Sequence, residues 1–206
     1  ILREIAAGRQ AYVVYPLVEK SEKVEAKSAV EHFEMLRSTV FANVRVGLLH
    51  GQMSWDEKEA AMQAFLRHEF DVLVATTVIE VGIDVPNASI MLIENAERFG
   101  LSQLHQLRGR VGRGAEQSMC FLVTKDHFRY HVSKQSGADE RMRSIVRLKT
   151  MEETTDGFRI AEVDLRLRGP GDVLGVRQSG LPDFRFADLV TDASLIVAAR
   201  EGAFRL

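Results

Sequence analysis

The feature that most constrains the fold is a set of five short apolar runs, separated by stretches with helical periodicity. The runs cover residues 11–15, 44–49, 72–75, 90–93 and 119–123. They are nearly continuous and rich in β-branched residues, which is typical of strands buried on both faces. The helical stretches cover 22–37 and 54–65, and the second begins with a capping box of Ser54 and Glu57. This alternation predicts an α/β fold in which helices flank a parallel sheet.

Three polar segments are expected to meet at one edge of that sheet, because ligands of open parallel sheets bind beyond the carboxyl ends of the strands. His50 follows the second apolar run, and Thr76 and Thr77 follow the third. The loop that leads to Arg110 comes after a later run. The sequence therefore predicts one shared ligand edge. Trp55, the single tryptophan, is expected to anchor the start of its helix.

The pattern changes near residue 125, where helical segments take over. Residues 138–153 and 158–168 each favour a helix, the triplet Gly169-Pro170-Gly171 is a strong stop, and 188–204 favours a final helix. The tail is therefore predicted to be a helical hairpin, an irregular loop and a C-terminal helix. We place the boundary so that one domain covers 1–125 and the other covers 126–206.

The segment 106–113 carries three arginines, and two of them directly follow a glycine. Arg110 and Arg113 present permanently charged, planar forks of donors that match phosphate oxygens. The preceding Gly109 and Gly112 let the backbone approach a ligand closely. Two arginines held near one point suit the stabilisation of a transferring γ-phosphoryl group. The alternative interpretation is a solvated, arginine-rich turn.

The sequence lacks the loop that would cradle the phosphates. No glycine is followed by lysine, so the pattern G-x-x-x-x-G-K-[ST] is absent, and no apolar run ends in an Asp-Glu pair that could hold Mg²⁺. The chain thus carries the arginine-supplying half of an ATPase. It begins at Ile1 in mid-pattern, as a piece of a longer protein would. We expect ATP and Mg²⁺ to be bound mainly by an upstream domain, and the chain alone not to hydrolyse ATP.

Positive charge is concentrated in one part of the chain. The net charge is −2, yet residues 108–150 contain ten Lys and Arg against four Asp and Glu. Such a basic patch is the electrostatic footprint of phosphate binding. No apolar run approaches the ~20 residues of a membrane span, and neither a signal peptide nor a metal-like grouping of histidines is present. We expect a cytoplasmic protein without a metal site of its own, in which Cys120 is a buried strand residue.

A second polar motif covers residues 72–86, where a strand ends in Thr76 and Thr77 and is followed by Gly82 and Asp84. The threonines can cap a turn or bond a phosphate. Gly82 permits close approach, and Asp84 can bond a ribose hydroxyl or the arginine pair. An ordinary strand-to-helix connection with a capping threonine explains the segment equally well.

Residues 72–86 and 106–113 together resemble motifs V and VI of superfamily-2 helicases, in their second RecA-like motor domain. Segments 12–19 and 49–53 lie where that family has motif IV and the segment after it. The resemblance implies that ATP lies between two RecA-like domains and that Gln106, Gly109 and the arginine pair reach it from this one. It also implies that the loop of His50 approaches the DNA backbone.

The tail resembles the translocation motif shared by RecG-type helicases and the transcription-repair coupling factor. Residues 164–180 carry this likeness, and 181–189 are similar to the RecG type alone. Arg147, Arg168 and Gln178 lie at the family's coupling positions. The resemblance implies the C-terminal half of an ATP-dependent helicase that remodels branched DNA, such as stalled forks and Holliday junctions. The alternatives are a coupling factor motor, which acts on RNA polymerase, and a non-catalytic module that binds duplex DNA.

Overall fold

The structure is a computed structural model that describes residues 1–16, 22–76, 84–112, 117–126 and 138–168. The chain divides into two compact units, residues 1–153 and residues 154–206. The first unit holds the sheet and most helices, and the second contributes one described helix. Each unit is treated by itself below.

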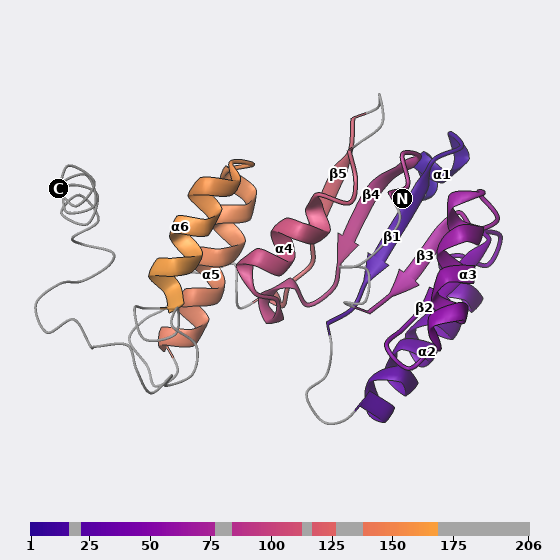
Figure 1. The fold of residues 1–206 in the computed structure, drawn as a ribbon, viewed down its shortest axis with the longest axis horizontal. Coiled ribbons are helices and arrows are strands. Elements are labelled where there is room, and N and C mark those ends of the chain that lie inside the picture. The colour runs from indigo at the N-terminus through magenta and orange to yellow at the C-terminus, as the bar shows by residue number, and fades with distance from the viewer. Residues whose placement is uncertain (17–21, 77–83, 113–116, 127–137, 169–206) are drawn as a thin grey trace, which may run out of the picture. The chain divides into compact units, whose positions relative to one another are not determined.

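The first unit is built on a five-stranded parallel sheet, as the apolar runs predicted. The strands are β1 (Gln10–Val14), β2 (Val46–Leu49), β3 (Val72–Ala75), β4 (Ala88–Ile93) and β5 (Met119–Leu122). They lie side by side in the order β2-β3-β1-β4-β5, and every pair is parallel (Figure 1). The three inner strands are buried almost throughout, whereas Met119 and Phe121 of the edge strand β5 are 39% and 43% exposed. The expectation of burial on both faces therefore fails at β5.

Helices precede, connect and follow the strands. They are α1 (Leu2–Ala6), α2 (Glu22–Ser38), α3 (Trp55–Leu66), the 3₁₀ turn η2 (Ala96–Arg98), α4 (Leu101–Arg108), α5 (Ala138–Glu153) and α6 (Gly157–Arg168). The predicted capping box is present, since the Glu57 amide donates to Ser54 Oγ at 3.2 Å and the Ser54 amide donates to Glu57 Oε2 at 2.7 Å. Sequence periodicity did not reveal α1 and α4, which are short.

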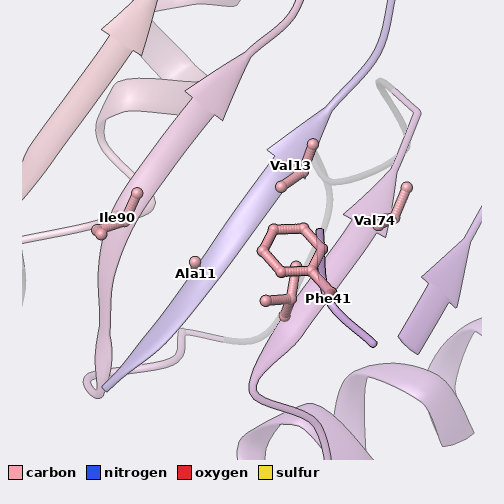
Figure 2. Packing of buried hydrophobic residues seen from close by; sticks show 6 residues of the cluster. Ala11, Val13, Phe41, Val74 and Ile90 are labelled. Atoms are coloured by element: carbon pink, nitrogen blue, oxygen red, sulfur yellow. The ribbon is translucent and has the colours of Figure 1, made fainter. Parts of the chain in front are cut away.

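The core lies on both faces of the sheet. On one face, a buried cluster is packed against by Phe33 and Leu36 of α2, by Ile5 of α1 and by Ile1, the N-cap of α1. That cluster consists of Ala11, Val13, Phe41, Val72, Val74 and Ile90. Figure 2 shows the Phe41 ring over the strands that carry Ala11, Val13 and Val74. On the other face, the ring of Tyr12 meets that of Phe65 in α3 edge to face, with centroids 4.9 Å apart. Burial of these apolar side chains is the main source of stability for the fold.

The helix α5 belongs to the first unit, although the sequence placed it in the second. Ser144 Oγ and a guanidinium nitrogen of Arg147 both donate to the carbonyl oxygen of Glu97 in η2, at 3.3 and 3.1 Å. At the other end of α5, a guanidinium nitrogen of Arg108 donates to the carbonyl oxygen of Met151 at 2.8 Å. These long-range bonds hold α5 on η2 and α4, so the boundary falls after residue 153.

The second unit confirms one predicted helix of the tail. The helix α6 covers Gly157–Arg168, and the side chain of Asp156 caps its start by accepting from the Phe158 amide at 2.9 Å. The predicted stop at residues 169–171 and the final helix at 188–204 lie outside the described residues.

Candidate nucleotide and DNA contacts at the two ends of the sheet

The carboxyl ends of the strands place four chemically different side chains in one row. The parallel ladder continues one residue past the strands. The amides of Thr76, Tyr15 and Glu94 donate to the carbonyls of Leu49, Ala75 and Val14, at 3.1, 2.9 and 2.8 Å. His50 directly follows Leu49 in β2. His50, Thr76, Tyr15 and Glu94 therefore follow neighbouring strands at the same level, which confirms that His50 and Thr76 share an edge.

His50 and Thr76 each hold a buried polar atom that has no hydrogen-bond partner among the described residues. The atoms are His50 Nδ1 and Thr76 Oγ1, and Thr76 is only 3% exposed. Burial is the largest cause that lowers the pKa of His50, and the charge of Lys58 lowers it further. The imidazole is therefore neutral at pH 7. A neutral ring and a hydroxyl can both donate to a phosphate oxygen.

The first arginine of the glycine–arginine motif lies in a turn that closes the helix α4. Gln106 is exposed in the last turn of this helix, and Gly109 is its C-cap. The Arg110 amide donates to the carbonyl of Leu107 at 3.0 Å. Gly112 has φ +86, and a Cβ at this position would come within 2.5 Å of Ser118 Oγ. A larger residue would therefore strain the turn that positions the arginine.

The charges of Arg110 and Asp84 both act on one buried side chain, that of Tyr12 in β1. Burial raises the pKa of Tyr12 well above its ordinary value, the charge of Arg110 lowers it, and the charge of Asp84 raises it. Both charges therefore reach the same phenol from two separate motifs. Asp84 is exposed and Arg110 is half-buried. The sequence had given Tyr12 no individual role, and its one signal was a tyrosine inside the first apolar run.

The expectation that the arginine turn shares an edge with His50 and Thr76 is wrong. Because β4 and β5 are parallel neighbours, the chain must return from the carboxyl end of β4 to the amino end of β5. The helix α4 and the Arg110 turn make this return. Asp84 likewise lies four residues before Ala88, the first residue of β4. The two groups of candidate residues therefore lie at opposite ends of the strands.

Several candidate residues lie outside the described residues. These are Thr77, Gly82, Arg113 and Gln178, while Arg168 is described only as the last residue of α6. Arg147 is described: it donates to the Glu97 carbonyl and, at 2.7 Å, to Ser144 Oγ. It therefore ties α5 to η2, which directly precedes α4.

Cys120 lies in β5 as predicted but is only partly buried. Burial raises its pKa to about 11, so the side chain is a thiol at neutral pH. Within the described ranges, no cluster of three or more His, Cys, Asp or Glu could hold a metal ion. None of the described helices is long and apolar enough to cross a membrane.

Comparison with known families gives the class of this fold and site. Residues 1–115 match the helicase conserved C-terminal domain. Residues 154–206 match domain 3, C-terminal, of the ATP-dependent DNA helicase RecG. The chain belongs to the helicase conserved C-terminal domain family, whose fold is the RecA-like sheet described above.

Within that family, the chain is homologous to the C-terminal region of RecG proteins. It is 55% identical over 203 residues to the ATP-dependent DNA helicase RecG of Synechocystis, covering 98% of this chain and 23% of that protein. It is 50% identical over 201 residues to that of Thermotoga maritima, with 98% and 24% covered. A solved structure of RecG bound to a three-way DNA junction is similar with a TM-score of 0.65 and 48% identity, covering 94% of this chain and 23% of that one.

Proposed function

We propose that the chain is the C-terminal part of an ATP-dependent DNA helicase that remodels branched DNA. The observation that carries the proposal is the homology of 98% of this chain to RecG, and the joint effect of the Arg110 and Asp84 charges on Tyr12 supports it. The chain spans about a quarter of the length of the curated relatives it matches. The remaining three quarters would supply the phosphate-cradling loop that this sequence lacks.

The amino end of the sheet would face the nucleotide. Arg110 and Arg113 would stabilise the charge that develops on the γ-phosphoryl group of ATP. The other nucleotide contacts would come from Gly82, Asp84, Gln106 and Gly109. Mg²⁺ would be held mainly by the upstream motor domain, because this sequence has no apolar run that ends in an Asp-Glu pair. The arginines would reach across to the phosphate from this domain. The electrostatic effect of Arg110 on Tyr12 supports this placement.

The carboxyl end of the sheet would face DNA. His50, Thr76 and Thr77 would contact backbone phosphates, and the unpartnered atoms of His50 and Thr76 support this role. The similar structure of RecG bound to a three-way DNA junction supports branched DNA as the substrate. Because that substrate is DNA, we place the protein in the cytoplasm. Its partners would be the upstream helicase domains of the same chain.

The tail would convert movement of the motor domains into movement of DNA. Arg147 would hold α5 on the motor domain through the Glu97 carbonyl. Arg168 and Gln178 would act on either side of the Gly169-Pro170-Gly171 stop. Arg168 ends α6, which places it where a helix gives way to the segment that would contact DNA. Domain closure can drive DNA only if such contacts change with nucleotide state.

Release of phosphate from ATP tests the proposal. It is measured for this chain alone and for this chain joined to the upstream helicase domains. The chain alone should give no DNA-stimulated hydrolysis, because it lacks the phosphate loop, and the joined protein should hydrolyse ATP and unwind a synthetic fork. Robust turnover by the chain alone would contradict the division of the site between two domains. Absence of fork unwinding by the joined protein would contradict the helicase assignment.

A further inference from the structure

Trp55 was expected to anchor its helix, yet 73% of its surface is exposed. It is the first residue of α3 and the single tryptophan of the sequence. A tryptophan that remains in water contributes little hydrophobic free energy to folding. Exposed aromatic residues of this size are enriched where proteins bind other molecules. Exposure alone does not define a contact, so the position and surroundings of Trp55 carry the argument.

The segment that carries Trp55 is held by hydrogen bonds on both sides. Glu57 Oε2 accepts from the Ser54 amide and from Ser54 Oγ, at 2.7 and 2.9 Å. Lys58 Nζ donates to the Gly51 carbonyl at 2.7 Å, and the Met53 amide donates to the His50 carbonyl at 3.2 Å. The indole is therefore presented from a fixed backbone, and little main-chain entropy is lost when it binds.

The indole lies at the end of the sheet that we assign to DNA. The helix α3 begins five residues after His50, which follows β2. The charges beside Trp55 indicate which part of DNA it can contact. Asp56 and Glu57 are exposed and repel phosphates, while the amine of Lys58 is already bonded to Gly51. The uncharged face of a base remains the suitable partner, because stacking needs no charge.

We propose that Trp55 is a stacking contact for an unpaired base of the DNA strand that meets the carboxyl end of the sheet. Branched DNA exposes such bases where strands separate. The inference rests on the proposed function, since it requires this end of the sheet to face DNA. Stacking adds affinity without adding a phosphate contact. A variant without the indole should therefore lose affinity for DNA, while the slope of that affinity against salt concentration stays the same.

Tryptophan emission tests the contact directly, because the chain has one tryptophan. Emission is titrated with a single-stranded 12-mer and with a blunt duplex, while labelled DNA reports binding by fluorescence anisotropy. We expect saturable quenching by the single strand and a smaller change with the duplex. Trp55→Ala should weaken single-strand binding roughly 5- to 150-fold, the affinity equivalent of one stacked base. Trp55→Phe should retain most of the affinity.

Val40→Ala is the matched control. Val40 is an apolar residue that is 56% exposed and lies in the turn between α2 and β2, at the amino end of the sheet. Trp55→Ala and Val40→Ala should both keep the melting temperature of the parent chain. Val40→Ala should also leave DNA affinity unchanged. If DNA binds but tryptophan emission does not change, and if Trp55→Ala binds DNA as tightly as the parent chain, the stacking contact is overturned. The assignment of this end of the sheet to DNA would then still stand. Absence of any DNA binding by anisotropy would instead overturn the assignment of this end of the sheet to DNA.

Discussion

At the carboxyl end of the sheet, His50 Nδ1 and Thr76 Oγ1 are buried without a hydrogen-bond partner among the described residues. At the amino end, several polar side chains are bonded within the protein. Gln10 Nε2 donates to the Phe65 carbonyl at 2.6 Å, and Asn87 Nδ2 donates to the Gly8 carbonyl at 3.0 Å. Ser89 near the start of β4 is an exception, since its Oγ is also unpartnered.

The difference indicates how each end works. A buried polar atom without a partner costs about 1–3 kcal/mol, and an external ligand that supplies the partner would recover this free energy. At the amino end, Gln10 and Asn87 already have partners within the protein, and the charges of Asp84 and Arg110 act on Tyr12. One end is therefore suited to gaining contacts with DNA, and the other to holding charges for chemistry on a nucleotide.

Loss of the arginine pair is the largest expected effect and tests the amino end. In the joined protein, Arg113→Ala should lower DNA-stimulated ATP turnover by roughly 10³–10⁵-fold, the contribution typical of an arginine finger. Arg110→Ala should also nearly abolish turnover. Lysine should rescue neither variant, because it lacks the planar fork. Phosphate release measures turnover, and anisotropy should show junction binding largely intact.

Arg67→Ala is the control, since Arg67 forms an exposed ion pair with Glu69 and should have normal turnover. Near-normal turnover in both arginine variants would show that the chemistry does not depend on this end of the sheet.

Coupling variants have the next largest effect and test how the two ends work together. Arg168→Ala and Gln178→Ala should keep substantial DNA-stimulated ATPase activity but lose fork unwinding by roughly tenfold or more, because coupling free energies are typically about 1–3 kcal/mol. Arg147→Ala should lose unwinding too. It should also melt at a lower temperature, since it removes a bond to the Glu97 carbonyl. ATPase, unwinding and thermal melting are measured on the same preparations.

The outcomes separate coupling from folding. If unwinding and ATPase activity fall together in Arg168→Ala and Gln178→Ala, or if these two variants melt markedly lower, the residues hold the tail folded. The comparison of the two ends would then stand without a role for the tail.

The sequence predicted the strands well because their signal is local. Continuous β-branched runs require no partner to be recognised, and β3 begins and ends at the predicted residues. The short helix α4 was missed although its buried Leu101, Leu104 and Leu107 recur at helical spacing, because it has only eight residues and its end merges with the glycine–arginine motif. Strand order also could not be predicted, since it depends on pairing between residues far apart in sequence.

The candidate site was predicted in its residues but not in its arrangement. Thr76 and Asp84 are eight residues apart in one motif, yet they lie at opposite ends of the strands. Local sequence shows that both are polar, but only the parallel pairing of β3, β1 and β4 assigns each to an end. Trp55 was misjudged for a similar reason, because whether a helix start is covered depends on distant segments.

A pH titration of DNA binding sharpens the assignment of the carboxyl end, with a smaller effect. The pKa of His50 is lowered from 6.5 by burial and by Lys58, so the ring gains its positive charge only as pH falls below that value. If the ring contacts a phosphate, affinity should rise on acidification by roughly fivefold, as expected for one partly screened charge contact. His50→Gln should remove the rise. Anisotropy between pH 7.5 and 5.5 measures it, and an equal rise in the variant would exclude His50 from the contact.

The smallest expected effect concerns the frame of the amino end. Asp71 Oδ2 accepts from the amide and Nε of Arg45, at 3.1 and 3.0 Å, and His68 Nε2 lies 3.2 Å from Oδ1. Hydrogen bonding to Arg45 is the first cause that lowers the pKa of Asp71 below 3.8. A lowered carboxyl pKa contributes stability that is fully present above the unfolded value and is lost as pH falls through the folded one.

Asp71→Asn should therefore lower the free energy of unfolding by about 1 kcal/mol at pH 7, the usual net worth of such a bond. The difference from the parent chain should begin to shrink as pH falls below 3.8, and it should vanish once pH has passed through the lower pKa of the folded Asp71 carboxyl. Urea denaturation at pH 7 and pH 3 measures both values. Arg67→Ala, which breaks a fully exposed pair, is the control and should change stability less. DNA affinity should not change, because Asp71 precedes β3 at the amino end while the proposed DNA contacts follow its carboxyl end. A loss of DNA affinity in Asp71→Asn would show that the two ends of the sheet are not independent.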